Sequence, residues 1–324
     1  MENSVTPLET IYRRLGSKLA EAFFRGSASL GRLHPLADPA RHGLEVLRDL
    51  PYRATGIPEH RLDIYRSSRH EAPLPVVLYL HGGGFRIMSK ETHWVMGLAF
   101  GRRGYLTVLP EYRLAPRQPF PAAVEDAAAA YVWVREHIAR FGGDPARIAL
   151  AGESAGANLV TALVLAACFE REEPFAREVF KAGPAPLVAA PACGLFQVTD
   201  PERFRRRRPG MARFLSDRIL ETSRSYLPNA EALPPGLIDF ADTVVALERG
   251  EAPARPLPPF FLGVGTKDPL LPDTRRLATA LTKIGVPHEV HYYPGEMHAF
   301  QAFVFRENAK RFWRAQYDFL ARHL

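Results

Sequence analysis

The stretch RIALAGESAGANLVTALVLAACFE, residues 147–170, decides the fold. It begins as an apolar strand and continues as an apolar run of helical length. Between the two, Gly152, Ser154 and Gly156 match the pattern G-x-S-x-G. In this pattern the serine occupies a sharp strand-to-helix turn that raises its oxygen above the sheet, and the glycines avoid a steric clash. The stretch predicts a nucleophilic serine, with an ordinary strand-to-helix turn as the alternative.

Strand and helix patterns alternate on either side of this turn. Apolar strands are predicted at 60–68, 73–82, 104–113, 186–192, 258–265 and 288–295. Amphipathic helices are predicted at 120–142 and 274–285. Strands with both faces buried, alternating with helices, are typical of a mostly parallel sheet that is covered on each side. The chain is therefore predicted to have an α/β fold.

Two stretches do not follow this alternation. Residues from about 7 to 50 show helical spacing, with apolar positions at Leu8, Ile11, Leu15, Leu19 and Phe23. Residues 194–257 are rich in Arg and Pro. We interpret both as a helical cap over the open end of the sheet, in which residues 1–55 are the N-terminal part and 194–257 an insertion. Residues 56–193 and 258–324 then form the main α/β domain.

Composition and charge indicate an ordinary globular protein without a nucleic-acid partner. The 324 residues are 47% hydrophobic and carry a formal net charge of +7. Because the basic residues are spread along the chain, we expect most of them to solvate the surface. The stretch RFRRRRPG, residues 203–210, lacks interleaved aromatics beyond Phe204, which favours a solvated face. An alternative is that the cluster Arg205–Arg208 biases the entrance toward acidic substrates.

Cysteine usage and the first residues predict a cytoplasmic protein. Cys168 and Cys193 are too few for a disulfide scaffold, and neither stands in a metal-binding spacing. The opening residues, MENSVTPLET, are acidic, and no apolar region of a signal peptide follows them. No run of 18 residues has the apolar character that a membrane span requires. We therefore expect neither a metal site nor a membrane span.

Three consecutive glycines lie in the loop HGGGF, residues 81–85. A glycine in a regular element costs roughly 0.5–1 kcal/mol relative to alanine, so three in a row suggest that bare backbone is needed there. Acyl transfer creates an oxyanion that requires nearby N–H donors. We predict that the amides of Gly82, Gly83 and Ala155 form this oxyanion hole. A loop that only reverses the chain direction is the alternative.

Five motifs together resemble one family. They are HGGGF, YRLAPRQPFPAAVEDA, GESAGANL, GTKDPLLPD and GEMHAF, in the order and spacing of the hormone-sensitive-lipase-like carboxylesterases of the α/β-hydrolase superfamily. The resemblance covers roughly residues 60–305. It implies the α/β-hydrolase fold with an eight-stranded, mostly parallel sheet and a helical cap. It also implies hydrolysis of short- to medium-chain esters without a cofactor.

The order Ser…Asp…His, expected for this superfamily, restricts the catalytic histidine to positions after Ser154. Four histidines lie there. His288 and His291 fall inside a predicted strand, and His323 is next to the C-terminus. His298 follows that strand in a loop and matches the family's histidine motif, so we predict that it is the general base.

The same order places the catalytic acid between Ser154 and His298. Asp268 follows the predicted strand at 258–265 by a two-residue turn, and it matches the family motif in which aspartate precedes Pro-Leu. Asp273 is the runner-up, although its place before a predicted helix suits a helix start. We predict that Asp268 orients His298, which activates Ser154 for attack on an ester carbonyl.

These residues predict a serine carboxylesterase that acts on small esters. An amidase or peptidase with the same triad and a non-catalytic small-molecule receptor on this fold remain as alternatives. The strand at 288–295 is an edge strand through which a homodimer could form. Four departures from the common family pattern leave the catalytic parts in place. Glu153 and Glu111 stand where aspartate is commonest, Arg117–Gln118 where Glu-His is usual, and Ala299 where glycine is commoner.

Overall fold

The structure, a computed structural model, describes residues 22, 25–69 and 73–324. The five apolar positions that predicted an N-terminal helix lie outside the described residues. They are Leu8, Ile11, Leu15, Leu19 and Phe23.

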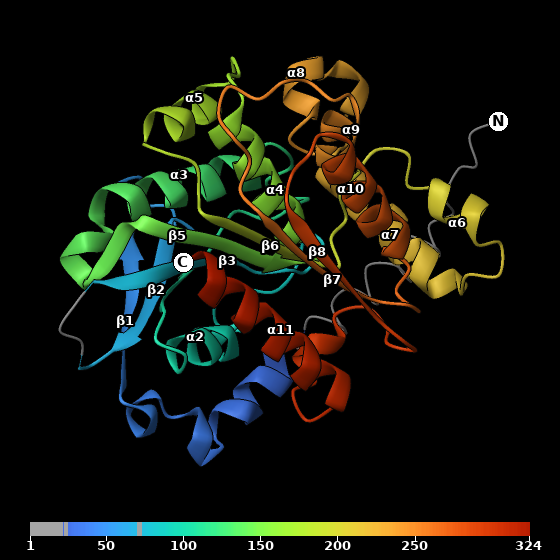
Figure 1. Cartoon of the computed structure of the whole chain (residues 1–324). Coiled ribbons are helices and arrows are strands. Elements are labelled where there is room, and N and C mark those ends of the chain that lie inside the picture. The colour runs from blue at the N-terminus through green and yellow to red at the C-terminus, as the bar shows by residue number, and fades with distance from the viewer. Residues whose placement is uncertain (1–21, 23–24, 70–72) are drawn as a thin grey trace.

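One eight-stranded sheet runs through the described part of the chain, with the order β1-β2-β4-β3-β5-β6-β7-β8 (Figure 1). Strands β3 to β8 pair in parallel, whereas β2 is antiparallel to both β1 and β4. The predicted mostly parallel sheet is confirmed. The strands are β1 (Leu44–Pro51), β2 (Arg61–Ser67), β3 (Leu74–Leu80), β4 (Leu106–Pro110), β5 (Gly143–Glu153), β6 (Val188–Ala192), β7 (Phe260–Gly265) and β8 (His288–Tyr293).

The helical expectation is wrong for residues 44–50. Residues 25–32 are helical, but Leu44–Pro51 forms strand β1, which pairs with β2 in the register Val46↔Tyr65. The strand lies at the edge of the sheet and its register shifts between Leu47 and Leu50. Because an edge strand of this kind is half-exposed and irregular, its sequence shows only a weak alternation of apolar and polar residues, which does not reveal a strand. These residues therefore belong to the sheet and not to the cap.

Helices cover both faces of the sheet (Figure 1). Helices α3 and α4 pack on one face, where Val76, Leu78 and Leu80 of β3 enter the larger core. Helices α2 and α11 pack on the other, where Val77 and Tyr79 enter a second core. The helices on these faces are α2 (Trp94–Gly101), α3 (Ala122–His137), α4 (Ala155–Cys168), α5 (Pro174–Lys181), α10 (Leu271–Lys283) and α11 (Glu307–His323).

Four α-helices lie in the segment between β6 and β7, and the expectation that residues 194–257 cap the sheet stays a prediction. These helices are α6 (Arg203–Arg207), α7 (Arg213–Tyr226), α8 (Pro235–Ile238) and α9 (Thr243–Glu248). The ring of Tyr226 stacks on Phe85 with centroids 3.7 Å apart, so α7 lies against the loop that follows β3. No helix among the described residues is long and apolar enough to cross a membrane.

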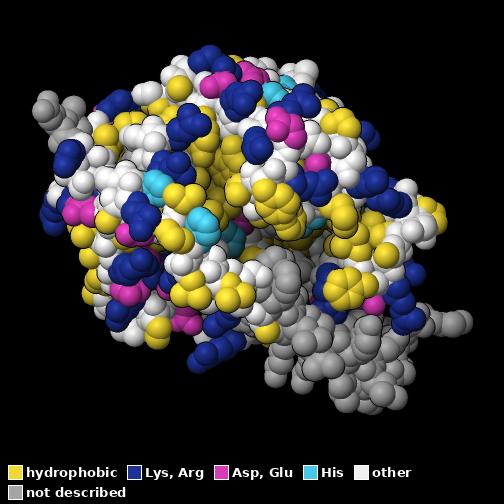
Figure 2. Space-filling view, turned by 90° about the horizontal axis from the view of Figure 1, so that it is seen from below, with side chains coloured by type: hydrophobic (Ala, Val, Ile, Leu, Met, Phe, Trp, Pro, Cys, Tyr) yellow, Lys and Arg dark blue, Asp and Glu magenta, His cyan; other side chains and the backbone are white. Residues whose placement is uncertain are grey.

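Basic side chains are scattered over the face of the molecule that Figure 2 shows. The face shown in Figure 2 carries Lys and Arg at many separate places among hydrophobic and acidic side chains. In the segment 203–208, Arg203 is buried while Arg205–Arg208 are exposed. Arg203 is therefore packed into the protein interior, whereas the side chains of the cluster Arg205–Arg208 face solvent.

Candidate active site

Ser154 stands in a strained turn between β5 and α4. Its φ of 56° and ψ of −115° lie in a region that non-glycine residues rarely adopt. A Cβ on Gly152 would meet the carbonyl oxygen of Leu80 at 2.6 Å, and one on Gly156 would meet that oxygen at 2.0 Å. Both glycines are therefore required for the strand-to-helix turn to pack against β3, as the sequence pattern predicts.

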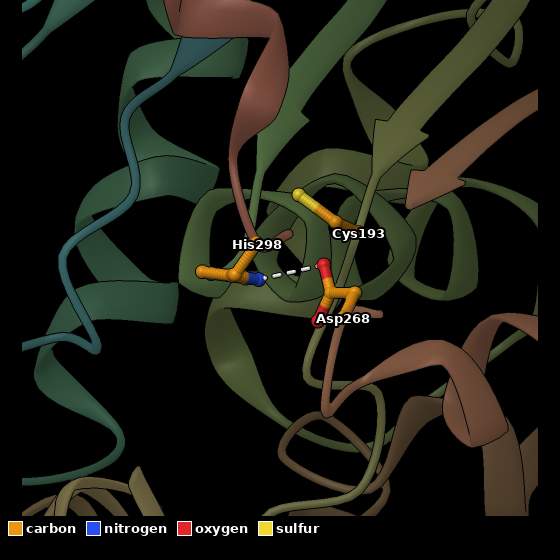
Figure 3. A group of neighbouring side chains, drawn as sticks. All are labelled: Cys193, Asp268 and His298. Atoms are coloured by element: carbon orange, nitrogen blue, oxygen red, sulfur yellow. Dashed lines mark hydrogen bonds and ion pairs between the residues drawn. The ribbon is translucent and has the colours of Figure 1, made fainter. Parts of the chain in front are cut away.

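Ser154, His298 and Asp268 meet above the carboxyl ends of three parallel strands. The Oγ of Ser154, after β5, lies 3.0 Å from Nε2 of His298, after β8. The Nδ1 of His298 lies 2.9 Å from Oδ2 of Asp268, after β7 (Figure 3). This arrangement allows the imidazole to take a proton from the serine while the carboxylate fixes its tautomer.

The surroundings of His298 and Asp268 favour this use of the imidazole. Asp268 is buried, and its second oxygen accepts the backbone N–H of Leu270 at 2.8 Å. The side chain of His298 is 32% exposed, so it faces both the carboxylate and the open side of the site. Burial disfavours its imidazolium, but the Asp268 carboxylate outweighs this effect and raises the pKa of His298 above its usual value.

The other acid candidate lies elsewhere. Oδ2 of Asp273 is 2.6 Å from the guanidinium of Arg203 and accepts the backbone N–H groups of Phe196 and Gln197. The carboxylate thus joins the start of α10 to the segment that follows β6. The structure assigns Asp273 a buried structural ion pair.

The other histidine candidates lie away from Ser154. His288 contacts the carbonyl of Val286, and His291 contacts the carboxylate of Glu289. His323 ends α11 and packs on Phe319.

The predicted role of Gly82 as an oxyanion donor is wrong. Its amide donates to the carboxylate of Glu153, and so it is not free to bind a substrate oxygen. No described residue accepts a hydrogen bond from the amides of Gly83 and Gly84, which follow it in the loop. The Ala155 amide is the first of α4, where intrahelical acceptors are lacking. The available donors are therefore those of Gly83, Gly84 and Ala155.

Both glycines in this donor set have backbone conformations that favour glycine. Gly83 has a φ of +110°, and a Cβ there would meet the carbonyl oxygen of Ile87 at 2.0 Å. Gly84 has a φ of +60°, and a Cβ there would lie 2.8 Å from Oγ1 of Thr222. The loop can keep this backbone conformation only because both positions lack side chains.

Cys193 lies beside the Asp268–His298 pair (Figure 3). Its sulfur, an Asp268 oxygen and a His298 nitrogen lie within 4.8 Å of one another, a spacing that a metal ion could bridge. Burial raises the pKa of the Cys193 thiol, so the sulfur keeps its proton, whereas a metal ligand has to be a thiolate. The Nδ1 of His298 is also occupied by Asp268. These contacts fit a packed neighbour of the triad better than a metal ligand.

A histidine that the sequence reasoning missed contacts the same region. His93 immediately precedes α2, and its Nε2 lies 2.9 Å from Oε1 of Glu153. His93 precedes Ser154 in the chain, whereas the order Ser…Asp…His predicts the catalytic histidine only after it. No motif in the stretch KETHW, residues 90–94, distinguishes this histidine from a solvated one.

Comparison with known proteins identifies the family. The sequence profile of a family described as having the alpha/beta hydrolase fold matches residues 77–302. The carboxylesterase NlhH of Mycobacterium tuberculosis is 31% identical over 263 residues, which cover 81% of this chain and 74% of that protein. The chain belongs to the hormone-sensitive-lipase-like carboxylesterases.

Other esterases resemble the chain in sequence and in structure. Esterase LipI of Mycobacterium tuberculosis is 32% identical, with 72% of this chain and 68% of that protein covered. The crystal structure of esterase LipW from Mycobacterium marinum matches with a TM-score of 0.73 and 26% identity, covering 99% of this chain and 91% of that one. A hyperthermophilic esterase from the archaeon Pyrobaculum calidifontis matches at 0.74 and 27%, covering 97% and 98%. The predicted α/β-hydrolase fold is confirmed.

Proposed function

We propose that this carboxylic ester hydrolase cleaves short- to medium-chain esters through an acyl-enzyme on Ser154. His298 takes the proton of Ser154 as Oγ attacks the ester carbonyl, and it then gives this proton to the departing alcohol. Asp268 holds the Nδ1–H of His298 and stabilises the imidazolium that forms. Water then attacks the acyl-enzyme by the same route and releases the carboxylic acid.

The observation that carries this proposal is the hydrogen-bonded chain Ser154–His298–Asp268, with links of 3.0 and 2.9 Å. Such a chain activates a hydroxyl that is otherwise a weak nucleophile at neutral pH. We assign binding of the oxyanion to the amides of Gly83, Gly84 and Ala155. Gly84 replaces Gly82 in the donor set that the sequence predicts. One donor of this kind typically contributes about 2.7–4 kcal/mol to transition-state stabilisation.

The alternatives are an amidase or peptidase that uses the same residues, and a receptor without catalysis. Steady-state assays with matched p-nitrophenyl esters and p-nitroanilides, from acetyl to dodecanoyl, test the proposal. We expect ester turnover with an optimum at short to medium chain length and anilide turnover that is much slower. Comparable rates on anilides would favour the amidase, and a lack of turnover on every substrate would favour the receptor.

We also propose a homodimer and a cytoplasmic location for this protein. The edge strand β8 is the candidate surface for a homodimer, because its backbone can pair with the same strand of a second copy. Light scattering coupled to size-exclusion chromatography tests this assembly. The two free, buried cysteines, Cys168 and Cys193, are compatible with the reducing cytoplasm that we propose as the location.

A further inference from the structure

The carboxylate of Glu153 is buried between the nucleophile turn and the glycine loop. Oε1 accepts the amide N–H of Gly82 and lies 2.9 Å from Nε2 of His93, while Oε2 accepts the hydroxyl of Tyr79. Glu153 and His93 are each less than 10% exposed. A buried carboxylate is costly unless it is paired and hydrogen-bonded, and here three donors from three segments meet it.

His93 has the contacts of an imidazolium. Its Nε2 faces the carboxylate of Glu153, and its Nδ1 lies 3.1 Å from the carbonyl oxygen of Ser89 and 2.9 Å from Oγ1 of Thr92. The Thr92 hydroxyl donates its own proton to the Ser89 carbonyl, so it accepts from the ring. Both ring nitrogens thus face acceptors, an arrangement that only the doubly protonated ring satisfies.

The charge environment of His93 agrees with these contacts. Burial disfavours its imidazolium, but Glu153, then the hydrogen bond to the Ser89 carbonyl and, more weakly, Glu111 outweigh this effect and raise the pKa of His93. The other titratable groups near its ring are Tyr79 and His81, whose ring centroids lie 6.4 and 5.3 Å away.

The position of this ion pair in the chain links it to catalysis. Glu153 directly precedes Ser154, and Gly82 directly precedes the two glycines whose amides remain free. The pair therefore joins the segment that carries the nucleophile to the loop that carries the oxyanion donors. A misplacement of about 1 Å at such a site can cost a hundredfold in rate.

We propose that Glu153 and His93 are positioning residues for the oxyanion hole: their buried ion pair holds the Gly82 amide and so fixes the Gly83 and Gly84 amides relative to Ser154. This inference rests on the proposed function. It assigns neither residue a contact with substrate. The pair acts through the loop backbone, and its loss weakens binding of the oxyanion more than binding of the uncharged ester.

The variants His93→Gln and Glu153→Gln, and their double variant, test the inference in the full-length chain. The matched control is His60→Gln, because His60 and Asp126 form an equally buried pair, 3.0 Å apart, that does not touch the glycine loop. Three quantities are measured: kcat and KM for p-nitrophenyl butyrate, the inhibition constant of an alkyl trifluoromethyl ketone, and the thermal midpoint. The ketone adds reversibly to Ser154 and places an oxyanion in the hole.

We expect kcat to fall about 10- to 100-fold in His93→Gln and Glu153→Gln, with KM little changed. The inhibition constant of the ketone rises by a similar factor, because the ketone adduct resembles the transition state. The double variant is no worse than either single one, since both break the same pair. His60→Gln lowers the thermal midpoint but leaves kcat and the inhibition constant unchanged.

The pH profile gives a readout that general destabilisation does not move. Because the pKa of His93 is raised, the imidazolium persists below that pKa and is lost as pH rises through it. Wild-type kcat therefore declines on the alkaline side, and this decline is absent from His93→Gln, whose side chain does not titrate. If His93→Gln fails to fold, Glu153→Gln gives the same readouts, because without the carboxylate no ion pair forms at any pH and the alkaline decline is lost as well.

The inference would be overturned if folded His93→Gln and Glu153→Gln kept the kcat and the ketone affinity of an active wild-type enzyme. That result would leave the proposed function intact. Equal losses in His60→Gln would also overturn it, because they would show a general effect of destabilisation. A wild-type protein that neither turns over esters nor binds the ketone would instead overturn the proposed function.

Discussion

Oγ of Ser154 lies 3.0 Å from Nε2 of His298, although 144 residues separate them in the chain. The sheet explains this proximity. β5, β7 and β8 run in the same direction, and Ser154, Asp268 and His298 each follow the carboxyl end of one of these strands. In open α/β sheets, ligands bind at the carboxyl ends of the strands.

The activity is expected to rise with pH through the pKa of His298. The imidazole must be uncharged to accept the proton of Ser154, and Asp268 raises its pKa above the ordinary value of 6.5. The protonated, inactive form therefore persists below this raised pKa and disappears above it. The pH dependence of kcat/KM for p-nitrophenyl acetate measures this directly. An acid limb centred below the ordinary histidine value would contradict the assigned contact.

Asp268→Asn is expected to lower kcat by about 10⁴-fold, because asparagine no longer holds the required tautomer of His298. The residual activity is also expected to have its acid limb at lower pH, since the carboxylate that raised the pKa of His298 is gone. Stopped-flow and steady-state assays across pH check both effects.

Asp273→Asn is the matched control for that variant. It leaves Arg203 buried without its carboxylate partner, which typically costs about 3–5 kcal/mol in the free energy of unfolding. We expect the variant to unfold at a lower denaturant concentration. When it is assayed well below its melting temperature, its kcat should equal that of the wild type. If Asp273→Asn lost activity while Asp268→Asn kept it, the assignment of the acid would be reversed.

Gly83→Ala is expected to lower kcat by at least about 100-fold, the typical effect of losing one oxyanion donor. The new Cβ would meet the Ile87 carbonyl oxygen at 2.0 Å and push the loop away from Ser154. Gly104→Ala is the control: Gly104 has a similar φ of +88° but open space around its Cβ position. It should cost about 1–2 kcal/mol of stability and leave kcat unchanged. Equal losses of kcat in both variants would contradict the role of the glycine loop as a source of oxyanion donors.

Much of the fold and of the triad could be predicted from the sequence, because those features have strong local signals. The two glycines around Ser154 are dictated by hard-sphere contact with β3, so the sequence pattern itself encodes the turn. His298 and Asp268 each follow a buried strand, and strand order brings their loops together. Local pattern and global fold agree at these positions.

Other features depend on contacts that local sequence does not encode. Strand β1 carries little local signal, because Leu44–Pro51 is mostly half-buried or exposed without regular alternation and pairs irregularly with β2. The hydrogen bond of the Gly82 amide has no local signal, because its partner, Glu153, lies 71 residues away in sequence. Which of several adjacent amides remains free is decided by such a long-range hydrogen bond. The contact of His93 with Glu153 is long-range in the same way, and no local motif marks that histidine.

Covalent labelling by diethyl 4-nitrophenyl phosphate tests the central claim most directly. The Oγ of an activated serine attacks phosphorus and expels 4-nitrophenolate. Intact-mass and peptide mass spectrometry then locate the diethylphosphoryl group. We predict one adduct, on Ser154, with loss of esterase activity in proportion to labelling, and neither adduct nor turnover in Ser154→Ala. Esterase activity that survives in Ser154→Ala, or stoichiometric labelling of another residue, would contradict the account.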